Sequence, residues 1–143
     1  MTDLEKYKFL LGEIVMLYQI IESDLKVITA AMLQGDYKKN LELIDKEVKG
    51  LGDAVRELEK LDNCDGKPFF NKAKYDFLKQ IARDRNFYCH ACCLDFAYKN
   101  DIEHSNEFRK SYKKLIATRE DLIAVQNSTE EFRMIVLKRY RGI

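Results

Sequence analysis

Most of the side chains that could do chemistry lie in one segment, Arg83–Cys93, whose sequence is Arg-Asp-Arg-Asn-Phe-Tyr-Cys-His-Ala-Cys-Cys. An imidazole can take up and release a proton at neutral pH. A guanidinium can stabilise the negative charge that develops on a phosphoryl group. An arginine and His90 on one helix are therefore a sensible pair for cleaving RNA without a metal, with His90 moving the proton of a 2′-hydroxyl.

The spacing of these residues indicates which of them share a face of a helix. Asn86 and His90 are four residues apart and lie on one face, and Arg83 falls close to the same line. At about 100° per residue, Arg85 points about 140° away from His90. The pattern predicts that Arg83, Asn86 and His90 face one groove while Arg85 points into the apolar side of the helix.

Arg85 occupies a position where the periodicity expects a core residue. The apolar positions around it are Leu78, Ile81, Ala82, Cys89, Cys92 and Phe96. Burying a guanidinium costs several kcal/mol unless it is paired or opens onto a wet cleft. A structural interpretation is also open, in which Arg85 pairs with a carboxylate such as Glu22 and His90 is an ordinary half-exposed histidine.

The stretch from Arg85 to His90 resembles the Arg-x(4–6)-His motif of the HEPN-domain family, in its Arg-Asn-x-x-x-His form. Arg83 also satisfies the longer spacing to His90. The resemblance implies a compact bundle of about five helices. In many members of the family it implies a metal-independent endoribonuclease of toxin–antitoxin, phage-defence or CRISPR systems. It further implies a homodimer in which the Arg83–Cys93 helices of two copies form one composite cleft.

Carried onto this chain, the resemblance gives four residues a role. His90 would be the general acid/base, Arg85 or Arg83 would contact the scissile phosphate, and Asn86 would orient the site. RNA and an antitoxin protein are the partners it implies. One branch of the family has a tyrosine two residues after the histidine; Cys92 stands there, so a tyrosine-modifying mechanism is not expected.

Other readings of the reactive side chains are weaker. Zinc normally draws its ligands from separated segments, and outside the Cys89–Cys93 cluster only Cys64 and His104 are available. Buried thiols that pack as small hydrophobes are the simpler expectation. Asp101-Ile-Glu-His104 is only half of a di-iron carboxylate signature. We therefore expect no metal and no cofactor.

Length and charge limit the class of protein. The chain has 143 residues and a net charge of +1, which fits one soluble helical domain over residues 1–143. Residues 1–66 carry 9 Lys/Arg against 14 Asp/Glu, whereas residues 67–143 carry 16 against 10. The basic second half is compatible with an anionic partner such as RNA. Its basic and aromatic clusters, 109–114 and 138–141, could bind an RNA backbone or simply form solvated helix faces.

Apolar periodicity predicts an all-α, antiparallel bundle of about five helices. The first helix spans about residues 4–32, and Thr2-Asp-Leu-Glu5 reads as its capping box. A second helix runs from 41 to 58 through Gly50 and Gly52, and a third from about Asn71 to about Lys99. After a polar link at 100–105, a fourth helix follows, and Ser128-Thr-Glu-Glu131 is expected to open a short fifth one.

No targeting or membrane segment is expected. The longest apolar stretch, Phe9–Ile21, is interrupted by Glu13 and is too short to cross a bilayer. We therefore expect a cytoplasmic protein whose four cysteines are free thiols. The alternative to an RNA endonuclease is a non-catalytic helical bundle that serves as an interaction or regulatory module.

Overall fold

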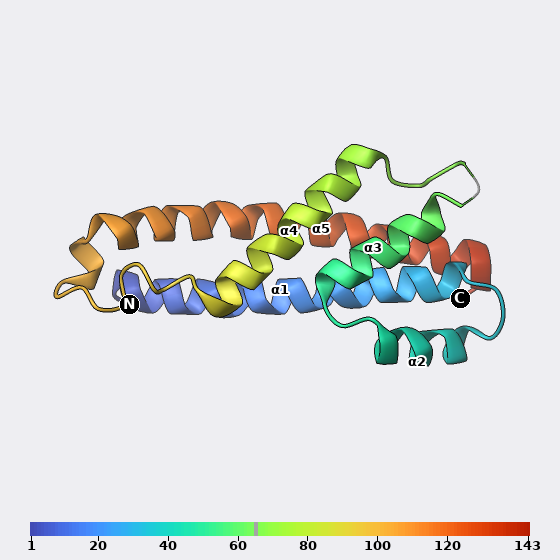
Figure 1. Cartoon of the computed structure of the whole chain (residues 1–143), viewed down its shortest axis with the longest axis horizontal. Coiled ribbons are helices and arrows are strands. Elements are labelled where there is room, and N and C mark those ends of the chain that lie inside the picture. Colours follow the sequence, from blue (N-terminus) through green and yellow to red (C-terminus); the bar gives the residue numbers. More distant parts are fainter. Residues whose placement is uncertain (65) are drawn as a thin grey trace.

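The computed structural model describes residues 1–64 and 66–143, and over these residues the chain forms α helices, one 3-10 turn and no strand (Figure 1). The all-α bundle is thus confirmed. The elements are α1 (Asp3–Met32), α2 (Tyr37–Glu47), α3 (Leu51–Asp62), α4 (Lys72–His90), the 3-10 helix η1 (Ile102–His104) and α5 (Asn106–Arg141).

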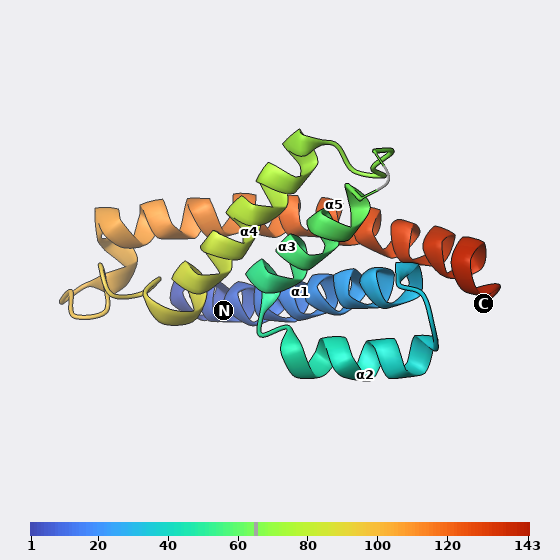
Figure 2. The same ribbon diagram turned by 45° about the vertical axis from the view of Figure 1, so that its right-hand side comes forward.

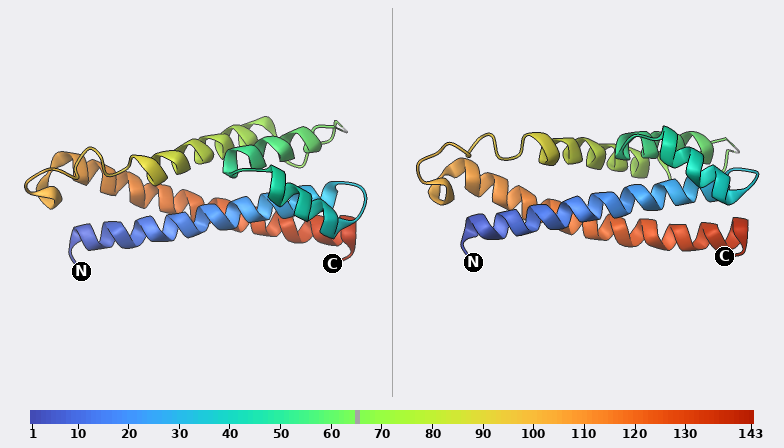
Figure 3. Two further views of the ribbon diagram at one scale, coloured as in Figure 1. Left: turned by 60° about the horizontal axis from the view of Figure 1, so that its bottom comes forward. Right: turned by 90° about the horizontal axis from the view of Figure 1, so that it is seen from below.

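The two longest helices, α1 and α5, run side by side and in the same direction, so the expected antiparallel order is wrong for this pair (Figures 1 and 3). In the polar pairs that join the two helices, the residue numbers increase together along α1 and α5. These pairs are Tyr7 with Ser111, Glu13 with Arg119, and Asp24 with Arg133. The parallel arrangement arises because three helices and η1 lie between α1 and α5 in the sequence and return the chain to its starting end.

Helices α3 and α4 form an antiparallel pair that lies over the α1–α5 layer, as both views of Figure 3 show. Helix α2 lies along the second half of α1 (Figures 1 and 2). The core is where the layers meet, and its fully buried side chains include Leu25 of α1, Val55 of α3, Leu78 of α4 and Leu115 of α5. Because α1 contacts every other helix, it is the central element of the fold.

Side-chain caps fix where the helices begin. The Thr2 hydroxyl accepts a hydrogen bond from the Glu5 N–H at 3.1 Å, which confirms Thr2 as the N-cap of α1. Among the described residues, the Glu5 carboxylate does not return the second bond of a capping box. Asn71 caps α4 as predicted, accepting from the Lys74 N–H at 2.8 Å. Both starts were readable from sequence because the capping residue and the amide it satisfies are only three residues apart.

The buried carboxylate of Asp62 joins α3 to α4. It accepts hydrogen bonds from the Phe69 N–H at 2.8 Å, from the Phe70 N–H at 3.1 Å and from the Tyr75 hydroxyl. Residue 65, between α3 and α4 in the sequence, lies outside the described residues. The bonds made by Asp62 hold the start of α4 against the end of α3, which sets where the rest of α4 lies.

The prediction of one helix from 41 to 58 is wrong, because the chain breaks into α2 and α3 around Gly50. Helix α2 ends at Glu47, and Gly50 has φ 111° and ψ 174°, a conformation that is essentially restricted to glycine. Val48 and Leu51, on either side of the break, are both buried. The apolar stripe thus continues through the turn, which is why the sequence pattern predicts one helix where there are two.

The expected third helix is also shorter than predicted. Helix α4 ends at His90 rather than near Lys99, and residues 91–98 form consecutive turns. Cys92 and Phe96 are buried, so they extend the apolar pattern without extending the helix. The Arg83–Cys93 segment is therefore a helix only as far as His90.

The break predicted before Ser128 does not occur, since α5 runs continuously to Arg141. Thr129 is buried inside α5, where its hydroxyl donates to the Asp24 carboxylate at 3.0 Å. In the Ser-Thr pair that resembled a cap, Thr129 therefore contacts α1, and Ser128 accepts a hydrogen bond from Lys74 of α4 at 3.3 Å. None of the helices in the described ranges is long and apolar enough to cross a membrane.

Candidate functional site

A pocket of about 260 Å³ lies between the start of α3 and the second half of α4. Its charged and polar lining includes five cationic side chains and, from the described part of the chain, one carboxylate, that of Asp53. The cationic residues are Lys49, Arg56, Lys79, Arg83 and Arg85. Such an excess of positive charge in a concave site favours an anionic occupant.

Arg85 is the half-buried member of this cluster. Within residues 1–64 and 66–143 its guanidinium makes neither a hydrogen bond nor an ion pair, and the expected alternative partner, Glu22, instead pairs with Lys26 at 3.3 Å. The interpretation of Arg85 as a salt-bridged structural residue is therefore wrong for this part of the chain. A partly buried guanidinium must be either paired with a carboxylate or open to water. Arg85 is open to water through the pocket.

The apolar line expected around Arg85 is corrected in part. Cys89 is exposed, and Tyr88 is the buried residue one position earlier, where its hydroxyl lies 2.9 Å from the Thr118 hydroxyl of α5. Tyr88 thus anchors the end of α4 on α5. This leaves Arg85 at the edge of the core rather than inside it.

Arg83 and Asn86 line the same pocket as Arg85, although the spacing placed Arg85 on a different face. The Arg83 guanidinium is exposed and is held along α4 by the Gln80 side-chain oxygen, at 2.8 Å from Nη2 and 3.3 Å from Nε. Asn86 is exposed. The pocket is thus wide enough for residues on both sides of Arg85 to line it. Helix α3 forms its other wall.

His90, the remaining predicted site residue, is exposed at the last position of α4. It is not among the residues of the described chain that line the pocket. It follows Asn86 by four residues, so the two side chains are neighbours on the surface of α4. The structure therefore brings Arg83, Arg85 and Asn86 together and leaves His90 one helical turn away, facing solvent.

Tyr18 of α1 lies beneath this part of α4. Its hydroxyl is buried and finds no hydrogen-bond partner in the described part of the chain. Burial raises the pKa of Tyr18 well above its ordinary value; the negative charge of Asp84 raises the pKa further, and the positive charge of Arg85 opposes the rise. Tyr18 is therefore neutral in the folded protein, and it is a potential hydrogen-bond donor behind the arginine.

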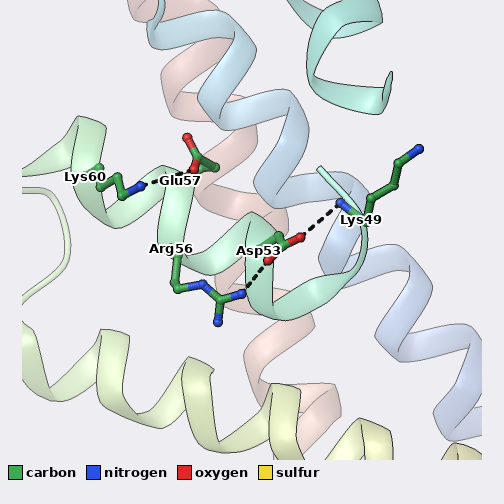
Figure 4. Close-up of polar contacts among 5 residues, drawn as sticks. All are labelled: Lys49, Asp53, Arg56, Glu57 and Lys60. Carbon is green, nitrogen blue, oxygen red and sulfur yellow. Dashed lines mark hydrogen bonds and ion pairs between the residues drawn. The ribbon is translucent and has the colours of Figure 1, made fainter. Parts of the chain in front are cut away.

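Sequence reasoning missed the half of the pocket that comes from the α2–α3 turn. Gly50 is the N-cap residue of α3, and a Cβ placed on it would lie 3.9 Å from Nη1 of Arg85. Figure 4 shows Asp53 at this turn, accepting a hydrogen bond from the Lys49 N–H at 3.3 Å and pairing with Arg56. The available signal was the Gly50–Gly52 pair, which marked a turn that would have placed Arg56 near α4.

The thiols do not form a second site. Cys92 is buried, and burial raises the pKa of its thiol, whereas Cys64, Cys89 and Cys93 are exposed free thiols. The expectation of buried thiols is therefore correct only for Cys92. Across the described ranges, no three His, Cys, Asp or Glu side chains lie close enough together to hold a metal ion.

Two cationic residues of the basic clusters of α5 contact other helices. Arg141 donates hydrogen bonds to backbone carbonyls at the end of α1, including Ala31 at 3.0 Å and Gly35 at 2.7 Å. Lys114 lies over the Phe87 ring of α4, 4.5 Å from its centre. Arg141 is half-buried, whereas Lys114 and the other basic residues of the two clusters are exposed, so these faces of α5 stay available for either interpretation.

A scan of protein-family models and searches of curated proteins and solved structures find no match to this chain.

Proposed function

We propose that this protein is a metal-independent RNA endonuclease of the HEPN type, in which Arg85 binds the scissile phosphate and His90 acts as general acid/base. The observation that carries the proposal is the state of Arg85: half-buried, without a paired carboxylate in the described chain, and open to a pocket rich in cations. A guanidinium held in this way can bind a phosphodiester oxygen without first breaking an ion pair.

The other side chains have roles that fit their positions. The exposed imidazole of His90 can reach a 2′-hydroxyl of a strand that passes over α4, and Asn86 lies between it and the pocket. The amide of Asn86 can donate to a phosphate oxygen or orient the histidine. Arg83, on the rim, adds a second guanidinium for the neighbouring phosphate.

We further propose that two copies meet along the end of α4 to form one cleft. RNA cleavage by this route needs a base that takes the 2′-hydroxyl proton and an acid that protonates the leaving 5′-oxygen. One chain offers one histidine at this place, because the other, His104, lies in η1 and is hydrogen-bonded to Asp101 at 2.9 Å. A second copy related by two-fold symmetry would supply the second imidazole.

The test is incubation of the purified protein with total RNA in excess EDTA, comparing wild type, His90→Ala and His104→Ala. We expect the wild type and the His104 variant to cleave equally. The His90 variant should cleave at least about 100-fold more slowly, the usual loss when a general acid/base is removed. Light scattering of the same samples should give the mass of a dimer.

Two results would contradict the proposal. Equal cleavage by wild type and His90→Ala would show that His90 takes no part in the reaction. Intact RNA from a verified dimer, with total RNA and with structured small RNAs, would favour the second candidate, a non-catalytic interaction module.

One observation favours that second candidate. Three large apolar side chains, Phe9, Met16 and Ile20, are exposed on the face of α1 that points away from the core, at 59, 63 and 41% of their full surface. Their spacing of seven and four residues places them in one line. Such a line is typical of a surface that binds another protein.

A further inference from the structure

The carboxylate of Asp53 occupies a cradle that is built for an anion. It pairs with the guanidinium of Arg56 and accepts a hydrogen bond from the Lys49 N–H, at the N-terminus of α3. Among the described residues, four other cationic side chains line the same pocket, although Lys79 is paired with Glu59 at 2.7 Å. The N-cap residue, Gly50, has no side chain with which to cap α3. An internal acid thus holds the place where the positive end of the helix and the Arg56 guanidinium meet.

We propose that this cradle is a second phosphate subsite, next to the one at Arg85, and that Asp53 is an intramolecular competitor for it. The inference rests on the proposed function for the identity of the ligand, a single-stranded RNA. Its binding groups are the Arg56 guanidinium and the Lys49 N–H. A backbone phosphate adjacent to the scissile one takes the position of the Asp53 carboxylate.

The position of Arg56 supports a role in binding. Arg56 is exposed, and Figure 4 shows its guanidinium extending from α3 toward α4. It lines the same pocket as Arg83 and Arg85. A strand whose phosphate contacts Arg85 therefore passes within reach of Arg56, which comes from a different helix and so fixes the direction of the strand across α4.

Competition by Asp53 follows from charge. A carboxylate and a phosphate cannot share one guanidinium cheaply, because their negative charges repel at short range. Binding of RNA must therefore displace Asp53 from Arg56, and the free energy of that exchange is subtracted from the affinity. Removing the charge of Asp53 while keeping its oxygen as an acceptor for the Lys49 N–H should tighten binding.

Helix α3 supplies its own matched control. Glu57 and Lys60 repeat the acid–base spacing of Asp53 and Arg56 one turn later, with their charged atoms 3.5 Å apart. They do not line the pocket at α4 among the described residues; both line a neighbouring pocket against α1 and α2. Figure 4 shows the two pairs along the same helix. Each substitution in the cradle therefore has a partner with the same change in net charge outside it.

The experiment measures the affinity of a fluorescently labelled single-stranded RNA 12-mer by anisotropy, in the His90→Ala background so that cleavage does not interfere. Arg56→Gln should weaken binding about fivefold and lower the slope of log Kd against log salt by about one. Lys60→Gln should change the affinity by less than about twofold, as expected of a charge outside the contact. Thermal unfolding of each variant checks that it is folded.

The second arm tests competition. Asp53→Asn should tighten binding about threefold or more, whereas Glu57→Gln, with the same gain of positive charge, should change it by less than about 1.5-fold. The subsite would be overturned if Arg56→Gln and Lys60→Gln changed the affinity equally, or if Asp53→Asn and Glu57→Gln did. Only the overall charge of the protein would then matter. Unchanged or weaker binding by a folded Asp53→Asn variant would overturn the competition.

The outcomes separate this inference from the proposed function. If the protein binds RNA with the pattern above but does not cleave it, the subsite stands and the endonuclease fails. If it cleaves RNA through His90 while Arg56→Gln binds like its parent, the endonuclease stands and the subsite fails. If the protein binds no single-stranded RNA, both fail.

Discussion

Two arginines in the molecule show opposite ways of using a guanidinium. Arg141, at the end of α5, donates to backbone carbonyls of Ala30, Ala31, Leu33 and Gly35, where α1 ends. Arg85, on α4, donates to no group of the described chain and lines a pocket instead. The first satisfies carbonyls that the end of a helix leaves without partners, whereas the second leaves its own donors available to a ligand.

The contrast extends to the helices that carry these residues. Two arginines of α5 form ion pairs with α1: Arg119 pairs with Glu13, and Arg133 lies 3.5 Å from the Asp24 carboxylate, although the buried Nε of Arg133 makes no hydrogen bond in the described chain. The arginines of α3 and α4 gather around the pocket. Arginine content alone therefore does not locate a site in this protein. What distinguishes the pocket is that its guanidinium groups outnumber the carboxylates within reach.

The largest expected effects come from replacing Arg141 or Arg85 with alanine. Arg141→Ala should lower the free energy of unfolding by about 2–3 kcal/mol, because it leaves several carbonyls at the end of α1 without a charged donor. Arg85→Ala should change stability by less than about 0.5 kcal/mol and slow RNA cleavage by at least about 100-fold. Urea unfolding and cleavage assays on the same preparations measure both.

Arg141→Lys is the control for this pair, since it keeps the charge but cannot donate to several carbonyls at once. We expect it to recover only part of the lost stability. The comparison breaks down if Arg85→Ala destabilises the fold as much as Arg141→Ala does, because Arg85 would then be a structural residue as well.

Features that depend on neighbours in sequence could be predicted; those that depend on distant helices could not. The caps at Thr2 and Asn71 and the seam of α1 follow from residues three or four apart, and the structure confirms them. For the half of the pocket on α4, the spacing correctly grouped Arg83 with Asn86, but it placed Arg85 on another face and His90 in the same groove. Arg56 was missed because it reaches α4 only through the turn at Gly50, which the continuous apolar stripe concealed.

An effect of intermediate size is expected at Gly50, in the turn between α2 and α3. It tests whether the pocket depends on the backbone geometry of this turn. Gly50→Ala should cost about 1–3 kcal/mol of stability, because its φ of 111° with ψ of 174° is strained for any residue with a Cβ. Gly52→Ala should be neutral or stabilising by about 0.5 kcal/mol. An added Cβ on Gly52 would approach nothing closer than Nη1 of Arg56, at 3.4 Å. Thermal unfolding of the two variants measures the difference.

An equal response of the two glycine variants would mean that the break between α2 and α3 is not held by Gly50. The pocket would then owe its shape to the packing of Val48 and Leu51 alone. If instead Gly50→Ala is destabilised and also binds RNA more weakly while folded, the turn contributes to the site as well as to the fold.

The smallest expected effect concerns Asp24, the buried acid of α1 that contacts Thr129 and Arg133 of α5. Burial raises its pKa above the ordinary value of 3.8, and the Thr129 hydroxyl and Arg133 only partly oppose the rise. A raised pKa means that the folded state holds the proton more tightly than the unfolded state, so this contribution to stability is lost as pH rises through the folded pKa. Asp24→Asn does not titrate. Its free energy of unfolding, measured in urea, should therefore improve relative to wild type as pH rises from about 4 through the folded pKa of Asp24. A difference that is constant with pH would show that the contacts with Thr129 and Arg133 fully offset the burial of Asp24, and that the acid is engaged as completely as Arg141 is.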